Sequence, residues 1–299
     1  MTPFAVSLDL KKEISLLGFD EKLTEECQLL VGGKISQIEI RMFRDKNPSM
    51  ERPDENLIKF WQNWCEIHSQ DTNEPMVSVG KIEREGKKII LYAHQKTYAE
   101  YLYNHQKPKL NKLLTTSPHL DNGDVLPLSV GAVALTAPSP QYPQGCVIFA
   151  KRGQTSFYAS QYTLVPGGYL HPEIDRISFK RGDSSKIKRY FRLISFEKGL
   201  NREFKEELPG LRPYYDLKIL GIFYNRSGSR QPMIAVSLRL EETAEEAQET
   251  LRQYRPDWEI ENFVFVPADI NSLREFLKNN RDKVVPDAVY RLVLWLNNI

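Results

Sequence analysis

Arg202-Glu203-Phe204-Lys205-Glu206-Glu207-Leu208 is the stretch of sequence that most restricts the fold and the chemistry of this chain. At 3.6 residues per helical turn, its glutamates lie on neighbouring parts of one helical surface. Apolar side chains recur at every fourth position, at Phe196, Leu200, Phe204 and Leu208, and form a stripe that can pack on a core. The pattern predicts a helix from about Phe196 to Leu208 that holds its carboxylates rigidly.

Ionised carboxylates placed so close together repel one another, and a bound cation removes that repulsion. Mg²⁺ suits such a site because it combines a few carboxylates with water and phosphate oxygens, and Mn²⁺ can take its place. Glu206 and Glu207 are the principal predicted ligands, and Glu203 is either a further ligand or a base that accepts a proton from water. Arg202 is expected to brace the glutamates. A solvated charged helix would have the same pattern, so the flanking sequence must decide.

The flanking sequence upstream contains the predicted strand GCVIFAKR and then Leu164-Val165-Pro166-Gly167-Gly168. Adjacent glycines predict a tight turn, because glycine reaches backbone conformations that other residues avoid. Here we expect Gly167 and Gly168 to shape the active site and contact the substrate. Strand, turn and helix together resemble the Nudix hydrolase family, within residues 121–299. The family pattern of a Gly followed by R-E-hydrophobic-x-E-E matches Gly168, Arg202, Glu203, Phe204, Glu206 and Glu207.

The sequence departs from the family pattern in two ways. The interval between Gly168 and Arg202 is much longer than usual, and Ile194 stands where the family has Glu. Glu197 could partly replace that carboxylate, but its helical angle differs, so we expect it to favour a helix start capped by Ser195. The final family Gly is displaced to Gly210. Glu259 and Glu261 are candidates for the later base or ligand that is common in the family.

The resemblance implies an α+β protein with a Nudix α/β/α sandwich and a mixed sheet. It implies a Mg²⁺-dependent hydrolase that cleaves a nucleoside diphosphate linked to another moiety, with the metal neutralising pyrophosphate oxygens and activating water. The long insertion, the N-terminal extension and PLSVGAVALT are similar to the UDP-glucose pyrophosphatase branch, which hydrolyses UDP-glucose or UDP-galactose to UMP and sugar 1-phosphate. ADP-ribose and capped RNA are alternative substrates. A noncatalytic, nucleotide-binding regulatory module is the alternative class, because Ile194 and the insertion are compatible with lost hydrolysis.

The 299 residues, 41% of them hydrophobic, are enough for a packed core. A turn-rich stretch, Thr115 to Asp124, predicts a boundary near residue 120. Residues 1–120 would form a smaller α+β domain that frames the substrate pocket, and residues 121–299 the Nudix domain. Strands are predicted at 34–43, 129–136, 146–152, 217–224, 232–240 and 260–266, and residues 76–92 are predicted to form two strands around the polar turn EREGKK. Further helices are predicted at 55–68, around Tyr98, at 243–253, after Ala268 and after Pro286.

The 41 Lys and Arg residues nearly balance the 39 Asp and Glu residues. This balance provides no electrostatic reason to expect nucleic acid or a membrane as partner, so the expected partner is a nucleotide-containing small molecule. The oligomeric state stays open.

The insertion at 169–195 has a local basic excess that either contacts substrate phosphates or is simply solvated. Trp258, Tyr158 and Tyr162 would stack on a base or pack in the core.

The remaining sequence signals favour a cytoplasmic protein with unpaired thiols. Cys27, Cys65 and Cys146 are scattered and lack a CxxC pair, so free thiols are expected. The first residues mix acidic and basic side chains and lack the apolar core of a signal peptide. No GxSxG, P-loop GKS/GKT or HExxH motif occurs, which argues against a serine hydrolase, a P-loop enzyme or a histidine-ligated zinc enzyme.

Overall fold

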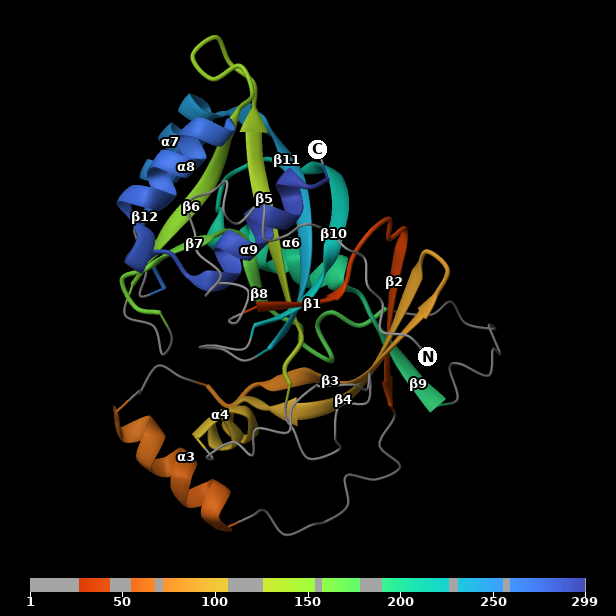
Figure 1. Cartoon of the computed structure of the whole chain (residues 1–299). Coiled ribbons are helices and arrows are strands. Elements are labelled where there is room, and N and C mark those ends of the chain that lie inside the picture. Colours follow the sequence, from red (N-terminus) through yellow and green to blue (C-terminus); the bar gives the residue numbers. More distant parts are fainter. Residues whose placement is uncertain are drawn as a thin grey trace. The chain divides into compact units, whose positions relative to one another are not determined.

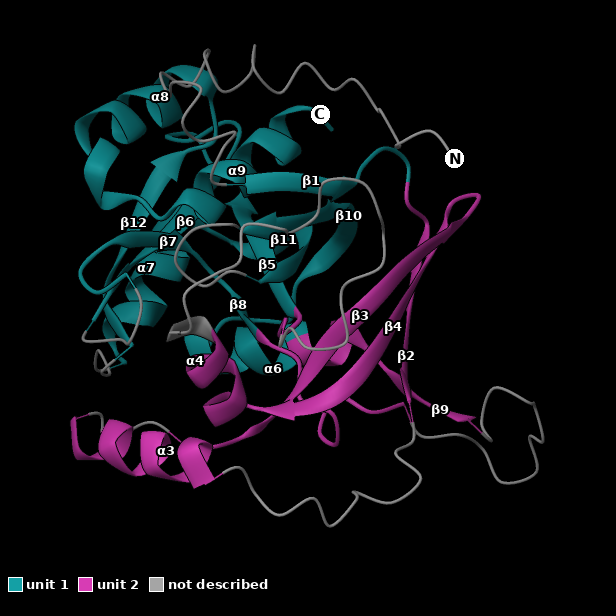
Figure 2. Ribbon diagram, turned by 60° about the horizontal axis from the view of Figure 1, so that its bottom comes forward, with its two compact units in different colours: residues 1–34, 129–168, 200–299 teal, residues 35–128, 169–199 magenta. Residues whose placement is uncertain are grey.

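The computed structural model describes residues 27–43, 55–67, 72–106, 126–153, 158–177, 190–225, 231–254 and 259–298. These residues form an α+β fold with two β-sheets, as predicted (Figure 1). The chain divides into two compact units, one from residues 1–34, 129–168 and 200–299 and the other from 35–128 and 169–199 (Figure 2). The boundary predicted near residue 120 lies between 107 and 125, outside the described residues.

The first unit contains an eight-stranded mixed sheet. Its main path runs β1-β10-β11-β5-β6-β12, in which β11 and β5 are parallel and the other neighbours are antiparallel. Two short strands, β7 and β8, pair with β6 and β5 respectively. The strands are β1 (Cys27–Val31), β5 (Ser129–Ala137), β6 (Cys146–Arg152), β7 (Tyr162–Leu164), β8 (Gly167–Tyr169), β10 (Tyr215–Asn225), β11 (Pro232–Thr243) and β12 (Ile260–Pro267).

Helices lie on both faces of this sheet. They are α6 (Phe196–Glu207), α7 (Ala244–Arg252), α8 (Ile270–Asn279), the 3₁₀ helix η1 (Arg281–Lys283) and α9 (Pro286–Leu296). Side chains alternate between the faces of a strand, and β12 shows the result. Val264 packs against the core cluster that contains Leu273 of α8 and Val293 of α9, whereas Phe263 shares a pocket with Leu251 of α7. The unit is therefore an α/β/α sandwich, as predicted.

Strands β5 and β6 separate near the predicted glycine turn. They pair at one position, Leu135 with Val147, and the segment that contains β7 and β8 lies between them. The Ala132 N–H donates to the Pro166 carbonyl at 2.8 Å, which holds this segment against β5. The bend falls at residues 165–166 and Gly167 already begins β8, so the bend lies just N-terminal to Gly167, where the sequence predicted the turn.

The second unit contains a four-stranded sheet in the order β3-β4-β2-β9. Its elements are β2 (Gln37–Phe43), α3 (Glu55–Ile67), β3 (Pro75–Glu85), β4 (Lys88–Thr97), α4 (Tyr98–Gln106) and β9 (Phe191–Ile194). The hairpin between β3 and β4 turns at Gly86, whose φ of 62° favours glycine. Strand β9 comes from the long insertion and pairs antiparallel with β2. The insertion thus adds a strand to this sheet, although its residues 178–189 lie outside the described chain.

Cys27, Cys65 and Cys146 are all free thiols, as predicted. Cys27 and Cys146 are buried and Cys65 is half-buried. Burial raises the pKa of the Cys146 thiol to about 12, so this side chain behaves as a small apolar core residue. Within the described part of the chain, no helix is both long and apolar enough to cross a membrane.

Candidate active site

Helix α6 forms where the sequence predicts it. The Ser195 hydroxyl accepts the Lys198 N–H at 3.2 Å, which is the capping bond expected at the helix start. Leu200 and Phe204 are buried, so the apolar stripe does pack on a core. Glu197 is exposed in the first helical turn, where its charge complements the helix dipole. The helix carries the candidate carboxylates on its last two turns.

Ile194 occupies the position at which the Nudix pattern has a glutamate, and it is only 2% exposed. It is the last residue of β9, opposite Ile40 of β2. Because this position belongs to the core of the second sheet, an apolar residue suits it and a carboxylate would not. The structure therefore explains the departure from the family pattern, since the insertion uses this position for packing.

Glu203 lies directly against Gly168. The Glu203 side chain is buried, with 9% of the residue exposed, and a Cβ added to Gly168 would lie 2.2 Å from its Cδ. Neither Gly167 nor Gly168 has a positive φ. A left-handed backbone conformation is therefore not what requires glycine here, and close approach is the reason that the structure supports. The absent side chain of Gly168 makes the room in which the Glu203 carboxylate sits.

Replacing Gly168 with Ala is expected to displace the Glu203 carboxylate, because the new methyl group and the carboxylate cannot share this space. We expect turnover to fall at least about tenfold, since an error of about 1 Å in a catalytic group costs up to about 100-fold. Steady-state kinetics on a cleaved substrate would measure the loss. Gly80→Ala is the control, because its Cβ would meet nothing closer than a His94 ring carbon at 3.5 Å. Equal kinetics for both variants would show that the position of the Glu203 carboxylate beside Gly168 does not matter for turnover.

Glu207 faces the other glycine. The Gly167 N–H donates to Glu207 Oε2 at 2.7 Å, and Glu207 is partly buried. A Cβ on Gly167 would lie 3.2 Å from the Val130 carbonyl oxygen and 3.3 Å from the Gly131 Cα, so this glycine is closely surrounded too. Strand β8 therefore brings its first two residues against two glutamates of α6.

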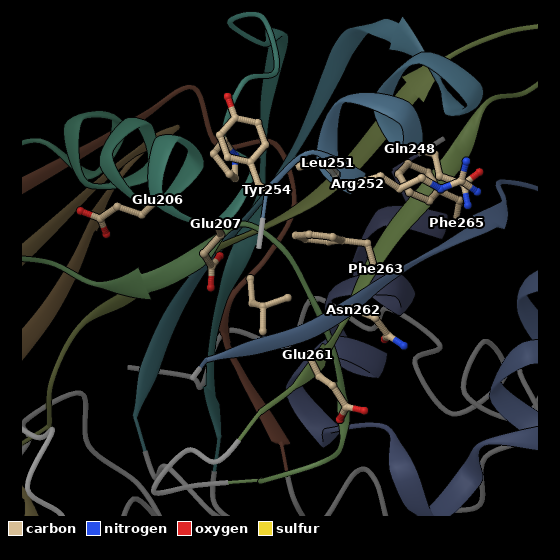
Figure 3. Close-up of a pocket in the computed structure, with 12 residues that line it drawn as sticks. Glu206, Glu207, Gln248, Leu251, Arg252, Tyr254, Glu261, Asn262, Phe263 and Phe265 are labelled. Carbon is tan, nitrogen blue, oxygen red and sulfur yellow. The ribbon is translucent and has the colours of Figure 1, made fainter. Parts of the chain in front are cut away.

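Glu206 does not converge with Glu207. Its side chain is 59% exposed and lies 3.5 Å from Arg202 Nη1, which also contacts Glu203 Oε1 at 2.5 Å. Figure 3 shows Glu206 and Glu207 pointing in different directions. Across the described ranges, no three acidic, histidine or cysteine side chains are close enough together to hold a metal ion. Arg202 thus bridges Glu203 and Glu206, while Glu207 stands apart from that pair.

Glu259 is an exposed residue directly before β12, and its charge acts on the buried glutamates of α6. Its charge raises the pKa of both Glu203 and Glu207, and its carbonyl accepts the Gly153 N–H at 2.8 Å. Glu261 instead pairs with Lys151 at 2.8 Å. Of the two later glutamates named from the sequence, Glu259 is therefore the one near the site. We call Glu203, Glu207 and Glu259 the carboxylate group.

Burial is the main reason that Glu203 and Glu207 hold protons tightly. Burial raises the pKa of Glu203 to about 7, with Arg202 opposing the shift and Glu206 and Glu259 adding to it. Burial, then the charge of Glu203, raises the pKa of Glu207 well above its ordinary value, although the Gly167 N–H opposes this. Several carboxylates that are close together and only partly open to solvent favour the binding of a divalent cation. Mg²⁺ in particular is held by one or two carboxylates together with substrate phosphates.

The raised pKa of Glu203 predicts that the metal-free protein loses stability as pH rises. The unfolded chain ionises this carboxyl near pH 4.5, whereas the folded protein keeps the proton until about pH 7. The folded state therefore binds more protons over that window, and the free energy of unfolding falls by up to about 1.4 kcal/mol per pH unit before levelling off. Urea unfolding of the parent protein and of Glu203→Gln from pH 4.5 to 8 would measure the contribution of Glu203 to the free energy of unfolding.

The same linkage predicts that Mg²⁺ raises the thermal midpoint more at pH 8 than at pH 5, because the ion binds the ionised carboxylates. Glu203→Gln should flatten the pH dependence over the window. Parallel stability curves for the variant and the parent protein would show that Glu203 titrates normally.

A buried arginine supports the strands that flank the site. Arg291 is 2% exposed and donates to the Ala132 carbonyl at 3.1 Å and to Thr163 Oγ1 at 3.3 Å. It also pairs with Asp287 at 2.9 Å. A Cβ on Gly131 would lie 2.7 Å from its Nη1, so that glycine makes room for the guanidinium. The sequence signal was an Asp and an Arg four residues apart in an apolar helix.

A pocket of about 270 Å³ adjoins Glu207 in the same unit (Figure 3). Its apolar lining comes from the loop after α6, the end of α7 and β12, namely Pro209, Leu251, Tyr254, Ile260, Phe263 and Phe265. Of the aromatic residues named from the sequence, Tyr162 packs edge-on against Phe276 at 5.4 Å and Tyr158 packs against the core. Trp258 lies outside the described residues.

Comparisons with known proteins complete the description of the site. No family model and no curated protein matches this chain. NrtR of Shewanella oneidensis is 17% identical with a TM-score of 0.34, over 56% of this chain and 60% of that chain, so this chain spans about 60% of its length. The MutT protein of Methanosarcina mazei Go1 is 16% identical with a TM-score of 0.30, over 52% of this chain and 92% of that chain.

The Nudix domain of NrtR in complex with ADP ribose is 15% identical with a TM-score of 0.29, over 68% of this chain and 99% of that chain. At TM-scores below 0.5, these similarities assign neither a family nor an activity to the chain.

Proposed function

We propose that this chain is a Nudix-type, divalent-metal-dependent hydrolase that cleaves the pyrophosphate bond of a nucleoside diphosphate linked to another moiety. The carboxylate group is the observation that carries the proposal. Glu203 and Glu207 lie against Gly168 and Gly167, and Glu259 is near enough to raise the pKa of both glutamates. Such a group costs stability when it is ionised, and a cation that binds it offsets that cost.

The residues present fit Mg²⁺, or Mn²⁺ in its place. Glu207 would hold the ion, and Glu206 is exposed enough to join it if it leaves Arg202. The ion would neutralise the pyrophosphate oxygens and lower the pKa of the attacking water. The Gly167 N–H keeps one oxygen of Glu207 in place, which leaves the other oxygen of that carboxylate for a ligand.

The reaction adds water across the phosphorus–oxygen–phosphorus bridge. The water oxygen bonds to one phosphorus, the bond from that phosphorus to the bridging oxygen breaks, and the second phosphate leaves with the bridging oxygen. A carboxylate takes the proton from the water. Glu203, whose pKa is raised to about 7, suits that role because a base works best when its pKa is near the working pH. Arg202 orients Glu203 through their contact at 2.5 Å.

UDP-glucose and UDP-galactose are the substrates that we propose within this class, with UMP and sugar 1-phosphate as products. The support is the sequence resemblance to the UDP-glucose pyrophosphatase branch, which rests on the insertion, the N-terminal extension and PLSVGAVALT. ADP-ribose is the principal alternative substrate. Capped RNA is a further alternative, for which the basic residues of the insertion would have to guide phosphates.

A second candidate is a nucleotide-binding module without turnover. Two observations favour it. Ile194 replaces the family glutamate with a buried residue of β9, and Glu206 points away from Glu207 (Figure 3). Such a module would keep the pocket beside Glu207 and bind nucleotides without cleaving them.

The deciding experiment is coupled product release from UDP-sugars, ADP-ribose, dinucleoside polyphosphates, NADH and capped RNA. Each substrate is tested with Mg²⁺, with Mn²⁺ and with a chelator. We expect one substrate class to be cleaved, only when metal is present. Nucleotide binding without cleavage under every metal condition would refute hydrolysis and establish the binding module.

A further inference from the structure

The pocket beside Glu207 has room for one end of a substrate. Its volume is about 270 Å³, whereas pockets that enclose a whole drug-sized ligand have roughly 300–1,000 Å³. Figure 3 shows the Phe263 ring extending from β12 toward Glu207, with Gln248, Arg252 and Phe265 gathered on the other side of that ring. A ligand in this pocket would therefore reach from the aromatic residues to the carboxylate group.

The lining of the pocket favours a flat aromatic group. Phe263 and Phe265 are two positions apart on β12, so both side chains lie on one face of the strand. Val264 between them packs against the core cluster, but Phe263 and Phe265 line the pocket and remain partly exposed. Rings that are left half-exposed in a concave site provide stacking surfaces for a planar ligand.

Three polar side chains supply hydrogen bonds at the edges of the pocket. Gln248 and Asn262 each offer an amide donor and acceptor, and Arg252 offers guanidinium donors. Arg252 pairs with Glu249 at 3.7 Å, and the two side chains are 65% and 69% exposed, so the guanidinium can turn toward a ligand. Amides and guanidinium groups next to aromatic faces match the edges of a heteroaromatic base.

The charge around the pocket determines which end of the substrate enters. Three carboxyl side chains, Glu206, Glu207 and Glu261, line it together with one cationic side chain, Arg252. An excess of ionised carboxylates over cations disfavours a phosphate group inside the pocket, whereas an uncharged base is not repelled. Phosphates would remain at the Glu207 side, where a cation held by the carboxylate group neutralises them. The base would therefore occupy the aromatic pocket, and the diphosphate would lie beside it, next to Glu207.

We infer that the pocket formed by Phe263, Phe265, Tyr254, Gln248 and Arg252 is the subsite for the planar heteroaromatic base of the substrate, with the diphosphate directed to Glu207. The inference deepens the proposed function and rests on it for the direction of the diphosphate. It assigns the base to the face of β12 that is turned to α7, and it makes Phe263 the stacking residue.

Equilibrium binding tests the subsite without requiring hydrolysis. The probes are UMP and AMP, with ribose 5-phosphate as the probe that lacks a base, each measured by titration calorimetry in the presence of Mg²⁺. We expect at least one nucleotide to bind about tenfold more tightly than ribose 5-phosphate, in line with the contribution of one base stacked on an aromatic ring. Phe263→Ala should remove this advantage and leave ribose 5-phosphate binding unchanged.

Two further variants separate stacking from general damage. Phe263→Leu keeps the apolar volume but removes the ring, so it should lose most of the same advantage. Tyr215→Ala removes an aromatic residue that is 48% exposed on β10, away from the pocket lining, and should bind all probes as the parent protein does. Thermal unfolding of each variant confirms that it is folded before binding is measured.

The outcomes distinguish this inference from the proposed hydrolysis. Equal binding of nucleotides and ribose 5-phosphate by the parent protein, or unchanged nucleotide binding in both Phe263 variants, would overturn the subsite even if the protein cleaves its substrate. Nucleotide binding that depends on Phe263, in a protein that cleaves nothing with either metal, would uphold the subsite and refute the hydrolase.

Discussion

Glu207→Gln is expected to lower kcat by about 1,000-fold, because a catalytic metal ion contributes several kcal/mol of transition-state stabilisation and each ~1.4 kcal/mol corresponds to about tenfold in rate. The amide has nearly the volume of the carboxylate, and its oxygen can still accept the Gly167 N–H that lies 2.7 Å from Glu207 Oε2. It is, however, a neutral and weaker ligand for a hard cation. The assay is steady-state turnover of whichever nucleotide substrate the panel identifies, with Mg²⁺ at saturating concentration.

The stability of Glu207→Gln should equal or exceed that of the parent protein at pH 8. Burial and the nearby charge of Glu203 raise the pKa of Glu207, so the ionised carboxylate is unfavourable in the metal-free fold, and a neutral amide avoids that cost. Glu197→Gln is the matched control, because Glu197 is an exposed residue in the first turn of the same helix. If Glu197→Gln and Glu207→Gln retain equal metal-dependent turnover, Glu207 is not a ligand.

Arg291→Met is expected to lower the free energy of unfolding by about 3–5 kcal/mol, the usual effect of removing one partner of a buried ion pair. The variant leaves Asp287, which is 7% exposed, without the guanidinium that lies 2.9 Å from its Oδ2. It also removes the donors to the Ala132 carbonyl on β5 and to Thr163 on β7. Urea unfolding monitored by circular dichroism would measure the change.

A double variant tests whether the uncompensated charge is responsible. Asp287→Asn combined with Arg291→Met removes both charges, so it should recover part of the stability that Arg291→Met loses. A loss below about 1 kcal/mol in the single variant, the level of an exposed ion pair, would show that this network does not support the strands. Equal losses in the single and double variants would show that packing, rather than charge, stabilises the helix here.

Local patterns in the sequence were sufficient for the longer elements of the fold. The four-residue apolar repeat predicted α6, and Ser195 caps that helix as expected. Alternating and apolar runs predicted β5, β6, β10, β11 and β12, and helix signals predicted α7, α8 and α9, but β1 and the short strands β7, β8 and β9 were not predicted. These predictions succeed because helix and strand periods are properties of consecutive residues, which the sequence displays directly.

Such local patterns could not predict contacts between segments that are far apart in the chain. The sequence could not show that Ile194 lies opposite Ile40 in another sheet, or that Glu259 adds its charge to Glu203 and Glu207 while Glu206 turns to Arg202. Helical spacing places three glutamates on one surface, but the direction of each carboxylate depends on the neighbours that it meets. Those neighbours come from strands and loops far away in the chain.

The sequence by itself determined the position of the glutamate helix and of the longer strands and helices around it. Only the tertiary structure decided which carboxylates come together, why Gly168 must lack a side chain, and where a pocket opens beside Glu207. The physical reason is that periodicity and capping act between residues a few positions apart, whereas burial, charge coupling and pocket shape depend on long-range packing.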